Sequence, residues 1–157
     1  DALAITLLQC RGFTSDDFAK SHPQGALGKR LLKKVSDVMF TKNLPTINSD
    51  SKLIKSIGVM SKYNHGIVIA LNDKQKVTGV FTDGDLRRTL KKNPDITNLT
   101  LKNFMTKNYI KIDDDILAAE ALTIMEECEI TSLIVIDKKN SLKGLLTMNL
   151  LLKKGID

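Results

Sequence analysis

Apolar and polar positions follow the same order in two stretches of the chain. In each stretch an extended segment precedes a helical pattern, and two short, nearly continuous apolar runs follow. The runs span 66–71 and 77–81 in the first stretch, and 132–137 and 142–146 in the second. Because a strand covered on both faces is apolar along its whole length, the runs predict buried strand pairs joined by hairpin turns.

A helix with one apolar face is predicted between the extended segment and the first run of each stretch. Asp50 and Ser51 are typical of a helix start in the first stretch, as are the aspartates of 113–115 in the second. The apolar positions of these helices are Leu53, Ile57 and Met60, and Leu117, Ala121, Leu122 and Met125. Further helices are predicted from Leu86 and from Leu150, so each stretch is a β-α-β-β-α unit.

The two units are copies of one sequence pattern. A shift of 65 residues places Gly79 on Gly144 and Thr82 on Thr147, and no gap is needed from 40 to 88. The same shift pairs Thr41 with Thr106, Ile47 with Ile112, Met60 with Met125 and Ile69 with Ile134. A unit of about 55 residues is marginally stable alone, so we predict an α/β (α+β) fold of two repeats packed sheet against sheet with pseudo-twofold symmetry.

Residues 1–34 stand outside the repeat. Two helix patterns and a turn containing Pro23 lead into the first unit, and the chain begins inside a helix pattern without Met or a cap. We therefore expect 1–34 to be the end of a domain that precedes the repeats. The predicted boundaries are 1–34 for this connector, 35–92 for the first repeat, 93–100 for a linker and 101–157 for the second repeat.

Composition narrows the choice of partners. The chain of 157 residues has 24 Lys and Arg against 18 Asp and Glu, a net charge of +6 that favours small anionic ligands. Aromatic residues make up 4% with no Trp, so stacking surfaces for single-stranded nucleic acid are scarce. Basic pairs near the predicted helix ends suit a solvated surface, and we expect no nucleic-acid partner. A basic nucleic-acid-binding domain is the alternative, and it predicts a steep salt dependence.

Cysteine usage and the short apolar segments predict a cytoplasmic protein with no membrane partner. Cys10 and Cys128 follow no metal-ligand spacing, and no cluster of His, Cys, Asp and Glu suits a metal ion. No secretory signal is recognisable, which favours a reducing compartment. Residues 2–8 are apolar but too few to cross a bilayer.

The turn after the second apolar run of the first repeat is the strongest candidate site. It joins a strand directly to a helix, where free backbone N–H groups and the helix dipole favour an anion. Thr82 adds a hydroxyl, Asp83 lies in the same turn, and Asp85 adds a carboxylate that could accept from a ribose diol. Thr-x-x-Asp at a helix start is also typical of a capping box, which needs no ligand. The local pattern leaves both interpretations open.

The duplicated unit, which ends in Gly-apolar-apolar-Thr in both copies, resembles a pair of cystathionine-β-synthase (CBS) domains over 35–152. The resemblance implies a nucleotide cleft between the repeats, with Thr82 on phosphate and Asp85 on ribose. The residues it places at or near the cleft are Thr46, His65, Gly66, Thr82, Asp83, Asp85 and Thr147. The ligand implied is an adenine or cytidine nucleotide or a nucleotide-sugar that acts as an effector.

The flank resembles the arabinose-5-phosphate isomerases, which join a sugar isomerase (SIS) domain to a CBS pair. The matching residues are the opening Asp-Ala-Leu-Ala, Arg-Gly-Phe at 11–13, and Ser-His-Pro-x-Gly-Ala-Leu-Gly at 21–28, with Gln24 where the family usually has Gly. The family interconverts ribulose 5-phosphate and arabinose 5-phosphate for the Kdo sugar of lipopolysaccharide. The resemblance implies a catalytic SIS domain on the same chain, of which 1–34 is the last helix and connector.

His22 is the candidate catalytic residue of this flank. Its polar, glycine-bounded turn alone suits an ordinary surface histidine. The resemblance implies a part in proton transfer through an enediol, for which an imidazole titrates in a suitable range. Other acid–base groups would come from the SIS domain. We therefore expect the chain by itself to be inactive, although its parent would be an aldose–ketose isomerase.

We expect a regulatory module that senses a small anionic ligand, forms a homodimer or homotetramer, and needs no cofactor for catalysis. A ligand-free oligomerisation module is the alternative. Measured binding of a nucleotide separates the two.

Overall fold

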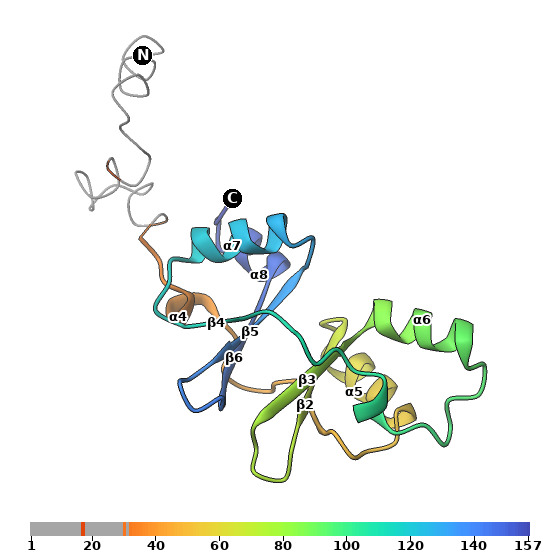
Figure 1. The fold of residues 1–157 in the computed structure, drawn as a ribbon. Helices are drawn as coiled ribbons and strands as arrows, with labels where there is room; N and C mark the ends of the chain where they lie inside the picture. The colour runs from red at the N-terminus through yellow and green to blue at the C-terminus, as the bar shows by residue number, and fades with distance from the viewer. Residues whose placement is uncertain (1–16, 18–29, 31) are drawn as a thin grey trace.

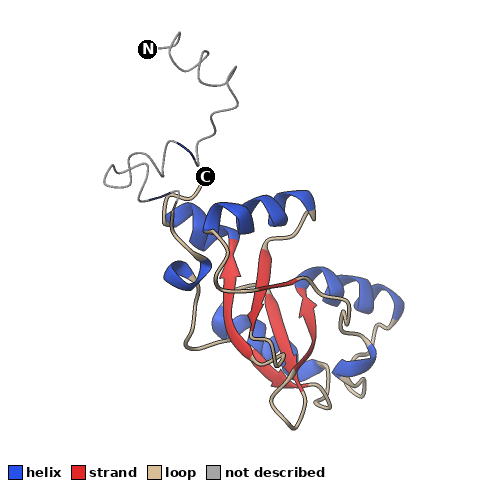
Figure 2. Ribbon diagram, turned by 60° about the vertical axis from the view of Figure 1, so that its left-hand side comes forward, coloured by secondary structure: helices blue, strands red, loops and turns tan. Residues whose placement is uncertain are grey.

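The structure is a computed structural model that describes residues 17, 30 and 32–157 (Figure 1). Most of the predicted connector, His22 included, lies outside the described residues. The described part contains two small three-stranded sheets at its centre, with helices on the outside (Figure 2). No helix among the described residues is long and apolar enough to cross a membrane.

The first sheet is built from the apolar runs of the first repeat. Its elements are β1 (Thr46–Asn48), α5 (Ile54–Tyr63), β2 (Ile67–Leu71), β3 (Val77–Thr82) and α6 (Asp83–Lys92). The strand order is β1-β2-β3, with β1 parallel and β3 antiparallel to β2. This is the predicted β-α-β-β-α order, and α5 and α6 contact β2 and β3.

The second repeat forms the same sheet again. Its elements are η1 (Leu101–Asn103), β4 (Lys111–Ile112), α7 (Ala118–Glu127), β5 (Ser132–Ile136), β6 (Leu142–Thr147) and α8 (Met148–Lys153). Ile69 pairs with Val80 in the first sheet, and Ile134 with Leu145 in the second. The register shifts at the same place in both hairpins, after Ala70 and after Val135. The prediction of a duplicated α/β fold is confirmed.

The two sheets share one core, which confirms the predicted sheet-against-sheet packing. A single cluster of buried side chains draws from both sheets: Ile67, Ile69, Val77, Val80, Ile134, Ile136 and Leu145. Each helix pair covers a second cluster on the outer face of its own sheet. Burial on both faces explains why the strands are apolar throughout.

Each repeat lends a segment to the sheet of the other. Phe40 pairs with Leu145 of β6, and Thr106 pairs with Val80 of β3, in each case as an isolated antiparallel bridge. Phe40 and Thr106 therefore occupy equivalent positions 66 residues apart, whereas Val80 and Leu145 are 65 apart. The gap-free 65-residue alignment from 40 onward is wrong at its start, because the first copy has one more residue between Phe40 and β1.

The helix α4 (Val35–Val38) is first-repeat sequence that packs on the second repeat. Val35 and Val38 belong to the buried cluster of the second repeat. The Val35 N–H donates to the Ile116 carbonyl over 2.9 Å, and the Ala118 N–H donates to Lys33 over 2.8 Å. The first residues of the first repeat therefore pack on the second repeat in the folded chain.

The predicted helix starts at the aspartates are wrong by several residues. Helix α5 begins at Ile54 and α7 at Ala118. The Asp50 carboxylate instead lies 2.7 Å from the Lys102 ammonium, and Asp115 pairs with Lys34. Both aspartates are thus paired with residues far away in the sequence, and the helices begin after them.

The apolar helix faces are mostly covered within one chain, although Ile57 and Leu117 are half-buried. Leu53, Ala121 and Met125 are completely buried and Met60 nearly so. Little of this apolar surface is therefore left for a partner copy. A homodimer or homotetramer stays a prediction without this support.

Candidate functional site

A cleft of about 660 Å³ lies between the repeats and contains most of the predicted site residues. One side is formed by the start of β2 and the β3–α6 turn, and the other by the segment before β4 and the start of β5. The predicted residues among its walls are His65, Gly66, Thr82, Asp83 and Asp85. Arg87 and Arg88, one of the basic pairs expected on a solvated surface, also line it.

The β3–α6 turn forms the capping box that the sequence allowed. The Asp85 N–H donates to the Thr82 hydroxyl over 3.2 Å, and the Thr82 N–H donates to Asp85 Oδ2 over 2.9 Å. The Thr82 hydroxyl also donates to Asp85 Oδ2 over 3.0 Å. The cap therefore exists, and because the same turn faces the cleft, the cap and a ligand site are compatible.

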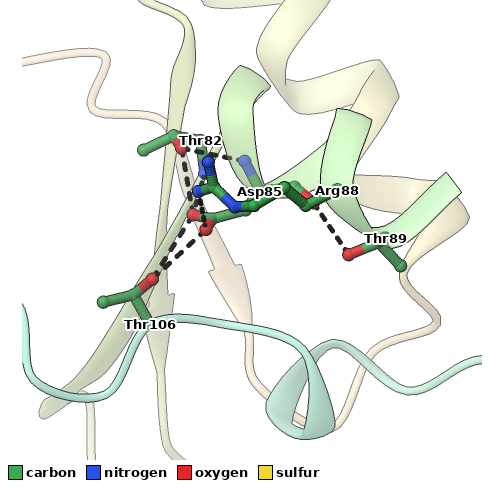
Figure 3. Close-up of polar contacts among 5 residues, drawn as sticks. All are labelled: Thr82, Asp85, Arg88, Thr89 and Thr106. Carbon is green, nitrogen blue, oxygen red and sulfur yellow. Dashed lines mark hydrogen bonds and ion pairs between the residues drawn. The ribbon is translucent and has the colours of Figure 1, made fainter. Parts of the chain in front are cut away.

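The second oxygen of Asp85 faces two further groups (Figure 3). Arg88 Nη2 lies 2.8 Å from Asp85 Oδ1, and the Thr106 hydroxyl donates to the same oxygen over 3.3 Å. The Asp85 side chain is only 11% exposed, whereas that of Arg88 is 71% exposed. A ribose diol could reach this carboxylate only by replacing these partners.

Gly66 brings the start of β2 against the turn. It has a φ of +66°, and a β-carbon there would lie 2.9 Å from an Asp83 carboxylate oxygen. The Asp83 N–H donates to the Gly66 carbonyl over 3.1 Å. Glycine is favoured here by both the left-handed backbone and the close approach.

His65 lies where two clefts meet. Its ring is 4.8 Å from that of Phe40, and its burial lowers the pKa of its imidazole. A second cleft of about 350 Å³ is lined by His65 and by Thr147. Thr131 and Ser132 line both clefts as well.

The second cleft repeats the cap and lacks the carboxylate. The Leu150 N–H donates to the Thr147 hydroxyl over 3.2 Å, as Asp85 does to Thr82. Leu150 packs against the core of the second repeat and offers no acceptor. The two clefts therefore differ in the one position that would bind a diol.

Thr46 does not line either cleft. It begins β1 and pairs with Ile69 in the sheet, so its predicted contact with a ligand stays a prediction. Sequence reasoning missed the cleft residues of the other repeat, which include Thr106, Asn108, Tyr109 and Ile110. The Thr-Lys-Asn pattern of 41–43 recurs at 106–108 and marked this segment as part of the repeat, but nothing in the pattern showed that it reaches the cleft.

Metal chemistry finds no support in the residues that the structure describes. Within 32–157 and at the two isolated described positions, no group of three His, Cys, Asp or Glu side chains could hold a metal ion.

Burial raises the pKa of Tyr109, and its hydroxyl donates to the Val77 carbonyl over 3.4 Å.

Comparison with known proteins gives a consistent picture. The model of the CBS domain family matches residues 35–92 and 101–156. Arabinose 5-phosphate isomerase KdsD of Pseudomonas aeruginosa is 45% identical over 157 residues, which are 99% of this chain and 48% of that protein. KdsD of Escherichia coli K12 is 41% identical with the same coverage. The chain thus spans about half the length of these curated relatives.

Solved structures share the fold. The CBS domain pair of protein MJ0100, in complex with 5-methylthioadenosine and S-adenosyl-L-methionine, superposes with a TM-score of 0.69 at 20% identity. That match covers 77% of this chain and 94% of the other. CBSX2 in complex with AMP gives a TM-score of 0.67 at 20% identity, covering 78% and 95%.

Proposed function

The chain belongs to the CBS domain family, and we propose that it is a ligand-sensing module that binds a nucleotide or nucleotide-sugar in the cleft built on Thr82. The observation that carries the proposal is that the β3–α6 turn and helix α6 supply a hydroxyl, a carboxylate and two arginines to one cleft between the repeats. A hydroxyl and guanidinium groups suit phosphate, and a carboxylate suits a ribose diol. The adenosine ligands of MJ0100 and CBSX2 support the same class of ligand.

We further infer that the module regulates an arabinose-5-phosphate isomerase. The identity of 40–45% to KdsD proteins extends over nearly the whole chain, including the segment before the repeats. The catalytic SIS domain would then be the partner on the same chain, and the reaction would serve Kdo synthesis in the cytoplasm. The effector would bias turnover in that domain from the CBS pair.

A thermal-shift screen tests the ligand proposal. AMP, CMP and ADP-glucose are each added at millimolar concentration, with inorganic phosphate as the matched control for simple anion binding. A ligand at 100 times its dissociation constant stabilises by about 2.7 kcal/mol, which raises the melting temperature of a chain of this size by roughly 5 °C or more. A flat response to all three probes contradicts the proposal.

A structural module without ligand is the second candidate. It is favoured by the Asp85 carboxylate, whose two oxygens already accept hydrogen bonds inside the chain. The same screen separates the candidates, and sedimentation at tens of micromolar reports whether the chain associates. Dimers with no response to any nucleotide would favour the structural module.

A further inference from the structure

Asp85 Oδ1 is held by two groups that both line the cleft and come from different repeats. Arg88 belongs to helix α6 of the first repeat, and Thr106 to the segment that crosses from the second (Figure 3). The other oxygen, Oδ2, is committed chiefly to the cap of the helix. A ligand can therefore use Asp85 mainly through the oxygen that Arg88 and Thr106 now occupy.

We propose that Asp85, Arg88 and Thr106 form a latch that a ligand opens by exchanging partners, with Arg88 moving to the ligand's anion and Asp85 to its hydroxyls. The proposal rests on the proposed function, since it concerns the same cleft. It adds that the anionic group and the vicinal diol of the ligand are both required, as in a ribose 5-phosphate unit. A ligand with only one of these groups would break the contacts of Asp85 with Arg88 and Thr106. It would then leave either the guanidinium or the carboxylate without a new partner.

The position of Arg88 suits this exchange. Its side chain folds back over Gly84, where a β-carbon would lie 3.3 Å from Arg88 Nη1 and 3.6 Å from the Thr82 hydroxyl oxygen. The guanidinium is thus beside the Thr82 hydroxyl, which would donate to a phosphate by turning its proton away from Asp85 Oδ2. A guanidinium binds phosphate through charge-assisted hydrogen bonds at least as well as it binds a carboxylate. With 71% of its side chain exposed, Arg88 can turn without moving the helix.

Thr106 can release Asp85 by rotating its hydroxyl. Its main chain is fixed to β3 by two hydrogen bonds with Val80, of 2.8 and 3.0 Å. The hydroxyl lies 3.3 Å from Asp85 Oδ1 and 3.5 Å from Oδ2, and these are the longest contacts of the carboxylate and the easiest to lose. The exchange is therefore a side-chain event, and the sheet does not have to move.

The second repeat has no such latch. Leu150 stands at the position of Asp85, and Lys153 at that of Arg88. Because leucine cannot accept a hydrogen bond, neither the resting contact nor the exchange can form there. The two-group requirement applies to the Thr82 cleft alone.

Calorimetric titration of the 157-residue chain tests the latch. AMP and CMP are compared with adenosine and cytidine, which lack the anion, and with the 2′,3′-dideoxy monophosphate of adenosine, which lacks the diol. We expect the ribonucleotide that binds to do so at least tenfold more tightly than its nucleoside or its dideoxy form. Equal affinity of nucleotide and nucleoside would overturn the two-group requirement.

Arg88→Gln gives the sharper test because the latch predicts opposite signs. The variant loses the phosphate contact, so nucleotide affinity should fall roughly tenfold. It also loses the competitor for Asp85, so nucleoside affinity should rise about threefold. Arg87→Gln is the matched control: Arg87 lines the cleft without a contact to Asp85 among the described residues, so nucleoside affinity should stay unchanged.

Thr106→Val removes the third member at nearly constant shape. Nucleotide and nucleoside should both bind more tightly to this variant, because a resting partner of Asp85 is gone. Weaker binding of both to Arg88→Gln, or no gain with Thr106→Val, would overturn the latch while the proposed function stands. No binding of any probe to the wild-type chain would overturn the proposed function and the latch together.

Discussion

A β-carbon added to Gly79 would lie 2.8 Å from the sulfur of Met105. It would also come within 2.9 Å of the Thr106 carbonyl oxygen. Gly144 stands in the same relation to Met39 and Phe40, at 2.6 Å from the sulfur and from the carbonyl oxygen. The glycine of the repeated motif is thus accounted for by the close approach of the crossing segment, one repeat against the other.

Gly79→Ala should lower the free energy of unfolding by about 1–3 kcal/mol, the usual cost of overpacking a filled site. The methionine can bend away, but the Thr106 carbonyl is fixed because it accepts from the Val80 N–H over 3.0 Å. Gly144→Ala should cost a similar amount in the second repeat. Urea unfolding followed by circular dichroism measures both.

Gly58→Ala is the control for these two variants. Gly58 lies inside α5, and nothing is within 4 Å of a β-carbon built there. Alanine in place of glycine within a helix stabilises by roughly 0.5–1 kcal/mol. A loss of stability equal to that of Gly79→Ala would show that close approach is not the cause.

The strands could be predicted because a strand that is buried on both faces has apolar residues along its whole length. Ile69 and Ile134 lie at the centre of apolar runs, and each pairs with the hairpin partner that the pattern gave. The duplication predicted the shared core, since a unit this small cannot bury enough apolar surface alone. These inferences needed only local pattern and length.

The crossing segments could not be predicted, because no periodic pattern marks a single backbone bridge. The contact between Thr106 and Asp85 joins residues from different repeats and depends on the bridge between Thr106 and Val80. The helix starts failed for a related reason. Asp50 is a residue type that is common at helix caps, but its carboxylate pairs with Lys102, which is distant in the sequence.

The stability of the chain should fall as the pH is lowered through about 6.5, in part because of His65. Burial lowers the pKa of its imidazole below 6.5 in the folded state. Between the two pKa values the unfolded chain binds more protons, so stability is complete above pH 6.5 and is lost toward the lowered pKa. His65→Gln should flatten the change in the urea midpoint between pH 7.5 and 5.5. An unchanged pH profile in this variant would contradict the assignment to His65.

His22→Ala, made in a longer chain that also carries the catalytic domain, should lower isomerase turnover by about 10²-fold, as loss of an acid–base group usually does. Ribulose 5-phosphate conversion measures the effect. Lys74→Ala, at the exposed hairpin tip, is the control and should keep full activity. The 157-residue chain alone should show no turnover, and near wild-type kinetics for His22→Ala would make this histidine a connector residue.

The pair Asp85 and Leu150 predicts one nucleotide per chain. Both residues donate their backbone N–H to the capping threonine over 3.2 Å, so the helix caps of the two turns are alike, whereas only Asp85 has a carboxylate. Each charge-assisted hydrogen bond to a diol contributes on the order of 1.5–3 kcal/mol, and 1.4 kcal/mol is a factor of ten in affinity. The Thr82 cleft should bind the nucleotide, and the Thr147 cleft should stay empty or hold a simple anion.

Calorimetric titration with the best nucleotide of the screen decides this. Asp85→Ala should weaken binding by well over tenfold, whereas Thr147→Val, which removes a hydroxyl from the second cleft, should leave it unchanged. Asp85→Ala also breaks the capping box and should cost about 1 kcal/mol of stability, so the titration is run well below its melting temperature. Loss of stability with unchanged affinity would mean that Asp85 only caps its helix. Two equivalent sites per chain would contradict the predicted asymmetry, because the cleft with Leu150 would then bind the nucleotide as tightly as the cleft with Asp85.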